Sequence, residues 1–130
     1  MSLSNYAENA TLTWLMTDTS VTRPTAWYAA LHTGDPGETG ANEVVVGTDA
    51  DYVRKSATFT DPTTGSCSNE AGISWTVDGA SAGYTITHVS IWDSLTTGNC
   101  LAIGALYSSH TVAANSVVSF AIGDLVVALD

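Results

Sequence analysis

The chain has 130 residues, with 3 basic and 13 acidic side chains, so its formal net charge is −10 when histidine is neutral. Three cations neutralise too few phosphates to hold DNA, RNA or an anionic membrane surface, so the expected partner is a protein. Hydrophobic residues make up 45% of the chain, which excludes a disordered tail. The length fits one domain, residues 1–130, with a core of its own.

The N-terminal segment carries the helix signal. Residues 4–17 are the helix candidate: Ser4 or Asn5 can cap it, and its apolar side chains recur at helical spacing up to Trp14. We assign residues 1–20 to a helix or arm. Two alternatives stay open: the helix packs on its own domain, or it docks on a neighbouring subunit.

The chain beyond Pro24 has the alternation and turn residues of short strands. The predicted strands are residues 26–33, 43–46, 52–59, 73–77, 84–94, 100–108, 117–122 and 125–129. About eight strands at a spacing of roughly 8–12 residues favour an antiparallel β-sandwich. The predicted fold is therefore mainly β, a jelly-roll-like or Greek-key-like sandwich over residues 24–130 with one N-terminal helix.

The residue types used in catalysis are present, but their spacing does not indicate a catalytic site. The serines in the stretches SNY, DTS and YSSH lie outside a G-x-S-x-G frame, and His32, His88 and His110 are far apart without metal-binding spacing. His88 lies inside a predicted strand, where a packed or hydrogen-bonded ring is the ordinary interpretation. Two loop carboxylates could in principle form a glycosidase site, but no pattern supports one. We therefore predict no enzyme, no catalytic residue and no cofactor.

Two loops concentrate acidic side chains: Asp35 with Glu38, and Asp49 with Asp51. Clustered loop oxygens are what Ca²⁺ prefers, but neither loop has the residue series of a known calcium loop. Solvated turn acids are the better interpretation, so no metal site is predicted.

Two cysteines and the N-terminal segment bear on the compartment. Cys67 and Cys100 can pair once or remain thiols, and we favour thiols because nothing else indicates secretion. The start MSLSNYAEN lacks a cationic and apolar signal sequence, and no apolar run approaches the ~20 residues of a membrane helix. We expect a soluble chain assembled in a host cytoplasm.

Aromatic and apolar residues on the helix, the first predicted strand and the last one are candidates for contacts between subunits. Aromatic side chains are common in interfaces, and the predicted last strand, which Asp130 directly follows, leaves an edge that another chain can pair with. The candidate interface residues are Tyr6, Trp14, Trp27, Tyr28, Leu125, Val127 and Leu129.

Several stretches occur in a distinctive order: NYAENATLTWLM, WYAALHTGDPGETG with NEV, DYVRKSATF, ISWTV, and the long block from THVSIWDS to FAIGDLVVALD. In these blocks the chain resembles a family of small phage virion proteins that are commonly labelled phage tail fibre protein. Similar proteins also serve as capsid decoration, or cement, proteins. The resemblance implies a virion structural protein and supplies no catalytic residues.

The expectation that follows is a cement protein on the outer capsid surface. It would bind the major capsid protein and further copies of itself, with a trimer preferred and a dimer possible. The alternative is a tail or tail-fibre component that acts as an adaptor or binds the host surface.

Overall fold

A computed structural model describes residues 1–129 of the chain. Asp130, the residue directly after the predicted last strand, lies outside the described residues. The helices are α1 (Asn5–Met16) and the short 3₁₀ helix η1 (Gly37–Thr39). The strands are β1 (Ser2–Leu3), β2 (Trp27–His32), β3 (Lys55–Ala57), β4 (Ser66–Ser68), β5 (Ile73–Thr76), β6 (Tyr84–Trp92), β7 (Cys100–Val112), β8 (Val117–Phe120) and β9 (Val126–Ala128).

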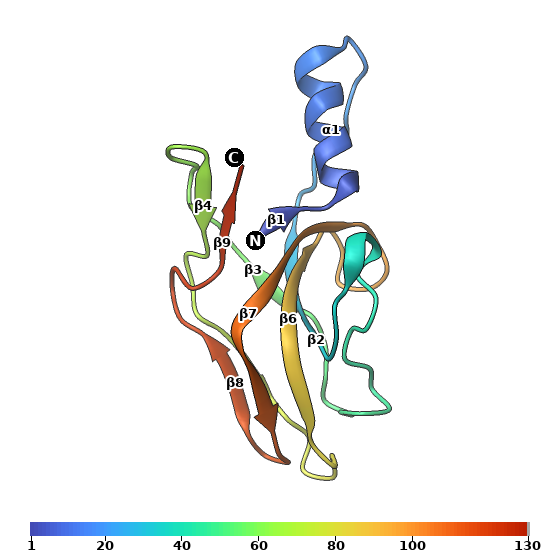
Figure 1. Cartoon of the computed structure of the whole chain (residues 1–130), viewed down its shortest axis with the longest axis vertical. Coiled ribbons are helices and arrows are strands. Elements are labelled where there is room, and N and C mark those ends of the chain that lie inside the picture. Colours follow the sequence, from blue (N-terminus) through green and yellow to red (C-terminus); the bar gives the residue numbers. More distant parts are fainter. Residues whose placement is uncertain (130) are drawn as a thin grey trace.

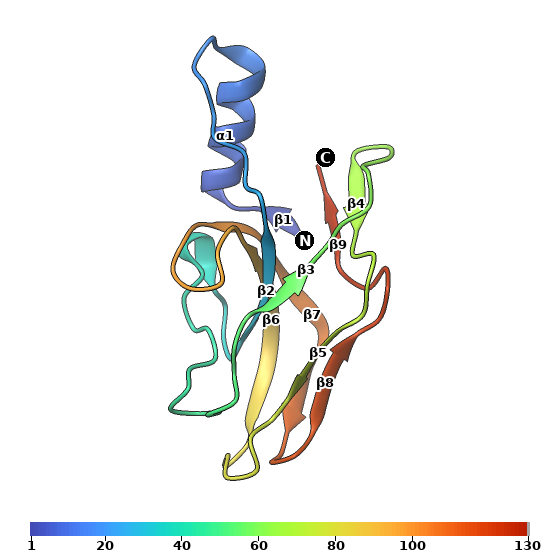
Figure 2. The same cartoon turned by 180° about the vertical axis from the view of Figure 1, so that it is seen from behind.

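All strand pairs are antiparallel. Five strands form one sheet in the order β1-β7-β6-β2-β3, and two ribbons, β4-β9 and β5-β8, lie across from it (Figure 1). The view from behind shows β3, β5 and β8 running beside one another in front of β6 and β7 (Figure 2). The prediction of a mainly β, sandwich-like fold with one N-terminal helix is confirmed.

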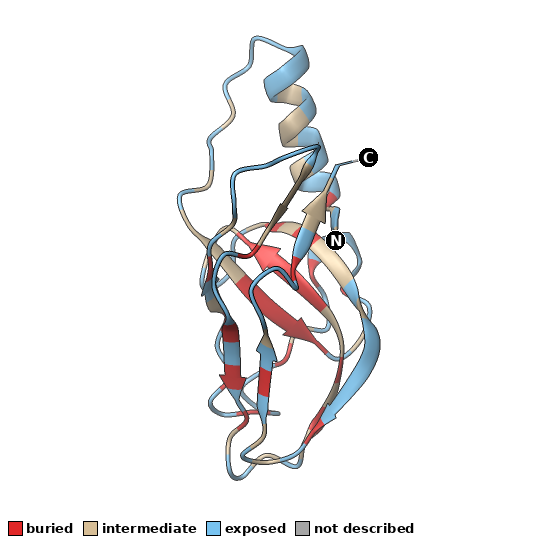
Figure 3. Cartoon of the chain, turned by 90° about the vertical axis from the view of Figure 1, so that its left-hand side faces the viewer, coloured by how far each residue is buried: buried red, intermediate tan, exposed pale blue. Residues whose placement is uncertain are grey.

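The core lies between the large sheet and the ribbons, where Figure 3 shows the buried segments facing one another. Strand β5 illustrates how the sequence builds it, because Ile73 and Trp75 are buried while the residues after them are exposed. The indole of Trp75 meets Phe120 of β8 edge-on, with ring centroids 6.1 Å apart. Its Nε1 donates to the carbonyl of Val53 at 2.8 Å, so the polar atom of this buried ring is satisfied.

The structure differs in several places from the strands predicted from the sequence. Of the predicted strand 52–59, only β3 (Lys55–Ala57) is a strand of the sheet. Residues 43–46 form no strand, since only Glu43 makes a bridge, to His32, and Val44 alone of the three valines is buried. Strand β7 runs to Val112, beyond the predicted end, because its far half pairs with β6. Strand β1 is not among the predicted strands, and β4 lies in the stretch DPTTGSCSNEAG, for which the sequence leaves a loop or a weak edge strand open. Both strands are too short for an alternation pattern.

Strand β1 joins the two halves of the fold. Ser2 and Leu3 pair with β7, while the backbone nitrogen of Met1 donates to the carbonyl of Val126 in β9 at 2.7 Å. Gly104 of β7 leaves room for this contact, since a Cβ there would lie 2.6 Å from Cγ of Met1. Among residues 1–129, no helix is long and apolar enough to cross a membrane.

We predict that Trp75→Ala lowers the free energy of unfolding by about 3–5 kcal/mol, because it leaves a cavity and an unpaired Val53 carbonyl. Urea denaturation followed by far-UV circular dichroism measures the loss. Tyr107→Ala is the matched control, since Tyr107 is fully exposed and should change stability by no more than about 0.5 kcal/mol. Equal losses in both variants would contradict the placement of Trp75 in the core.

Candidate assembly interface

Helix α1 begins at a buried serine. Ser4 is fully buried and is the N-cap of the helix, where its Oγ accepts from the backbone nitrogen of Ala7 at 3.3 Å. The same Oγ donates to the carbonyl of Cys100, and the Ser4 backbone nitrogen donates to the carbonyl of Leu101. The helix is therefore tied to the start of β7 by one residue that belongs to both elements.

Beyond this base, α1 projects away from the strands β1–β9, which together form the β-domain (Figure 1). None of its twelve residues is buried, and the exposed side of the helix is visible along its length in Figure 3. Its largest exposed apolar side chains are Tyr6 at 44%, Leu12 at 58%, Trp14 at 68%, Leu15 at 60% and Met16 at 77%. So much apolar surface on one element marks a site of interaction in soluble proteins.

The apolar side chains of α1 lie on two opposite faces. At about 100° per residue, Tyr6, Ala10 and Trp14 share one face through their i, i+4 spacing. The other exposed apolar side chains, Leu12, Leu15 and Met16, share the opposite face. A helix that is apolar on both sides is normally surrounded by protein, rather than packed on one surface.

The first of these faces forms one wall of a groove of about 640 Å³ between α1 and the β-domain. Its apolar lining includes Tyr6, Trp14, Trp27, Phe59, Leu101 and Val127. The charged side chains in the lining are Arg23 and Asp61, and the guanidinium of Arg23 lies 6.0 Å from the ring centroid of Trp27. The lining resembles the core of a protein interface, which is apolar and aromatic with few charges.

The seven candidate interface residues are placed differently by the structure. Four of them line the groove: Tyr6, Trp14, Trp27 and Val127. Leu129 is exposed at the end of the described chain. Tyr28 is half-buried on β2, opposite Trp92 of β6 and outside the groove, while Leu125 is 3% exposed and belongs to the core. Leu125 is therefore unavailable to a partner.

A serine–histidine contact that the sequence did not predict lies inside the domain. Nε2 of His32 and Oγ of Ser90 are 2.6 Å apart, and the backbone carbonyl of Ala41 lies 2.8 Å from Nδ1. A catalytic pair needs access to substrate and a group that orients the base. Here His32 and Ser90 are both fully buried, and the orienting group is a peptide carbonyl. We assign this pair a structural role.

Beside it lies the ion pair between Arg54 and Glu43. The guanidinium donates to both carboxylate oxygens, at 2.8 and 2.9 Å, and lies over the ring of Trp92 with Cζ 3.6 Å from its centroid. It also donates to the carbonyls of Ser94 and Thr97. Arg54 is 8% exposed, so this network joins the connection between β2 and β3 to the loop between β6 and β7 and offers no open anion site.

The acidic loops have structural partners. The buried carboxylate of Asp49 accepts from the hydroxyl of Tyr84 at 2.8 Å and from the backbone nitrogen of Asp78 at 3.0 Å. Burial, together with this bond to Asp49, raises the pKa of Tyr84. Glu38 accepts from the backbone nitrogen of Asn5 at 2.7 Å, at the N-terminus of α1. Across residues 1–129, no group of three or more potential ligands is arranged to hold a metal ion.

The two cysteines are free thiols. Cys67 is half-buried in the lining of the groove, and burial raises its pKa. Cys100 is buried at the start of β7, and burial raises its pKa to about 11. The preference for thiols over a disulfide thus agrees with their separate positions.

Comparison with protein families gives one match over nearly the whole chain. The model of the family Gp80, described as podophage GP4 fiber I protein gp80, matches residues 2–128. The chain belongs to this family. As a member of the Gp80 fibre family it is a phage virion structural protein, which confirms the resemblance noted from the sequence. A comparison with curated proteins finds no match.

The buried His32 predicts a pH dependence of stability. Burial lowers the pKa of His32 below its ordinary value of 6.5, so the unfolded chain takes up a proton at a higher pH than the folded chain. This contribution to stability is present above about pH 6.5 and is lost as the pH falls below it. We expect the urea midpoint to decrease between about pH 7.5 and 5.5.

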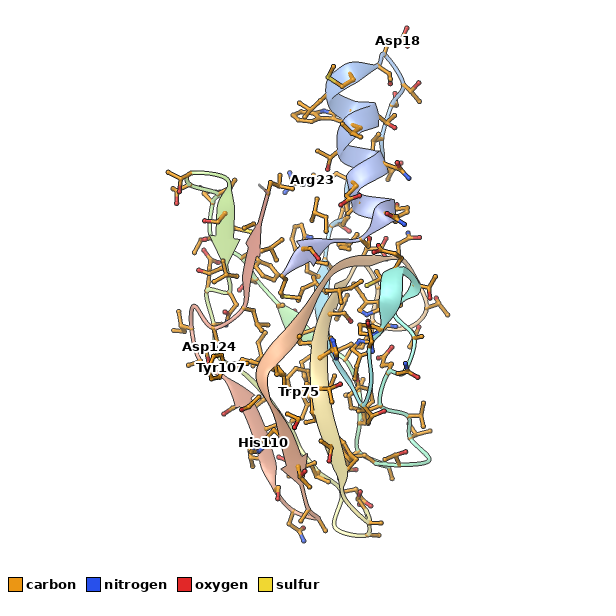
Figure 4. All side chains as sticks on the ribbon, viewed as in Figure 1. Asp18, Arg23, Trp75, Tyr107, His110 and Asp124 are labelled. Atoms are coloured by element: carbon orange, nitrogen blue, oxygen red, sulfur yellow. The ribbon has the colours of Figure 1, made fainter. Side chains whose placement is uncertain are left out.

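The decrease should be smaller in the variant His32→Gln, which cannot take up a proton in this range. His110→Gln is the control, because His110 is exposed on β7 (Figure 4). A pH dependence that is unchanged by His32→Gln would assign the effect to other groups.

Proposed function

We propose that this chain is a structural component of a podophage tail fibre and that helix α1 and its groove bind another protein chain of the virion. The observation that carries the proposal is the projecting helix, which has no buried residue although it carries five large apolar side chains. The Gp80 fibre family supports the fibre rather than the shell as the location.

The composition of the groove suits assembly. Its walls are mostly apolar, so little polar surface loses its water when a partner binds. Aromatic anchors and one arginine are the residue types that contribute most binding energy in protein interfaces, and Trp14, Trp27 and Arg23 provide them. A binding function that depends on packing needs no catalytic group, in agreement with the buried position of the His32–Ser90 pair.

The charge of the chain is consistent with a position on the outside of the particle. A net charge of −10 disfavours contact with packaged DNA and opposes close approach of similar acidic subunits at low salt. Attachment to the particle should therefore tighten when moderate salt screens this repulsion.

A capsid cement protein is the second candidate. The sequence contains no internal repeat of the kind that builds a long shaft, and a compact module with one apolar arm can bridge neighbouring major capsid subunits. Repetition over a symmetric shell would supply avidity for such an arm even if each contact were weak. The two locations differ most in the number of copies that a virion holds.

We expect a few to a few dozen copies per virion, as for a tail fibre. Quantitative mass spectrometry of purified particles, referenced to the major capsid protein, measures this ratio. A ratio near one copy per major capsid protein would overturn the fibre location in favour of cement. Absence from purified particles would overturn both locations.

A further inference from the structure

We propose that the partner of this surface is a second copy of the chain. In the resulting two-fold pair, helix α1 of each copy lies antiparallel in the groove of the other. The inference rests on the proposed function only in taking helix α1 and its groove as an assembly surface. It adds the identity of the partner and the direction in which the two helices meet.

The two apolar faces of α1 are the first argument. A helix inserted in the groove contacts α1 of the other copy on one side and the β-domain on the opposite side. In a two-fold arrangement the faces with Tyr6, Ala10 and Trp14 meet each other, and the small Ala10 permits close approach. The opposite face, with Leu15 and Met16, then covers the groove wall formed by Phe59 and Val127 of the other copy. Both exposed faces become buried, which packing on one surface would not achieve.

The charges are the second argument. Asp18 follows the C-terminal end of α1, where the helix dipole disfavours an anion, and the last turn contains no basic residue. Arg23 lies beside the base of the helix, in the lining of the groove (Figure 4). Among residues 1–129, neither side chain takes part in an ion pair. A twelve-residue helix is about 18 Å long, so the two charges lie near opposite ends of α1.

An antiparallel pair of helices gives each of the charges of Asp18 and Arg23, unpaired among residues 1–129, a partner of opposite sign. It places the C-terminal end of each α1 beside the base of the other, so that Asp18 of each copy approaches Arg23 of its partner. Two equivalent ion pairs form at the two ends of the interface. The chain has only three basic residues, and Arg54 is already paired with Glu43. Arg23 is therefore one of only two remaining basic side chains that could form such an ion pair.

The buried area is the third argument. Full burial of an aromatic side chain removes about 150–250 Å² from water, so the exposed parts of the five large apolar side chains of α1 amount to on the order of 500 Å². An interface of standard size buries about 800 Å² on each partner. The exposed apolar side chains of α1 therefore supply more than half of this area, and the walls of the groove add to it.

A two-fold pair differs from the trimer that was preferred on the sequence alone. That preference came from the expected decoration role, whereas the complementary ends of α1 require only two copies to satisfy each other. An interface in which the same surface is used by both partners closes on itself and does not propagate to further copies.

The test is the mass of the purified full chain in solution, measured by light scattering after size exclusion at ~0.15 M salt over a range of concentrations. The unchanged chain should be a dimer. Asp18→Arg and Arg23→Asp should each weaken dimerisation by about tenfold or more, because each places like charges at both ends of the interface. The double variant should restore the dimer.

Mixing the two single variants gives the sharper result. A chain with Asp18→Arg and a chain with Arg23→Asp have opposite charges at both junctions of a mixed pair, so the mixture should form dimers more readily than either variant alone. Single variants that dimerise like the unchanged chain, or a mixture that stays monomeric, would overturn the antiparallel arrangement. A monomer or trimer of the unchanged chain would overturn the two-fold pair.

An apolar variant tests the same surface independently of charge pairing. Leu15→Glu should convert the dimer to monomer, and circular dichroism should show an unchanged β-domain because Leu15 is exposed. Ile122→Glu is the matched control, since Ile122 is equally large and 70% exposed but lies outside the groove. Loss of the dimer in the control variant, or its persistence in Leu15→Glu, would overturn the assignment to α1.

The mass of the chain in solution and its copy number in virions together separate this inference from the fibre proposal. A chain that is present in virions at fibre copy number but remains monomeric in solution would overturn the pair and leave the fibre role intact. A dimeric chain that is absent from virions would overturn the fibre role and leave the pair intact.

Discussion

The direction of α1 depends on the hydrogen bonds of one buried side chain, Ser4. A hydroxyl is the smallest side-chain group that can donate and accept at once, and Ser4 uses it to join the carbonyl of Cys100 to the backbone nitrogen of Ala7. The helix therefore leaves the sheet at an angle that is set before any partner arrives. A groove whose walls are already in place costs less ordering entropy on binding than a free arm would. The hydrogen bonds of Ser4 thus hold the apolar side chains of α1 in one orientation, in which a partner can bind them.

The helix itself has little support from its own domain beyond that joint. Isolated helices of about twelve residues are marginal in water, and α1 buries none of its residues. Its cap, the acidic Glu38 at its N-terminus and good helix formers such as Leu15 and Met16 favour the helical state locally. A partner that packs on α1 thus stabilises the helix as well as the complex. The β-domain, in contrast, has a core of its own around Trp75 and the buried network of Arg54 with Glu43.

Local sequence patterns predicted the fold class. They did not predict features that depend on contacts between residues distant in sequence. The start of α1 at Ser4 and the alternation around Trp75 are readable because each depends on neighbours within a few residues. The exposed position of Trp14 and its place in a groove depend on where β9 runs, more than 100 residues later. The contact of His32 with Ser90 spans 58 residues and has no local signature. For Arg54 a signal existed, because the alternation in the predicted strand 52–59 places it on the same face as Tyr52, which is buried, but an arginine on such a face is normally exposed.

The position of β1 has a consequence for the order in which the chain folds. The bond from Met1 to the carbonyl of Val126 spans 125 residues, and Ser4 meets a strand that begins 96 residues later. Contacts so distant in sequence form late, since the entropy of closing a long loop must be overcome first. The segment of α1 is synthesised early but receives its anchor only after β7 exists, and its groove is completed only by β9. Helix α1 and its groove are thus among the last parts of the chain to reach their folded positions. Chains that are still folding on the ribosome therefore present no completed binding surface to one another.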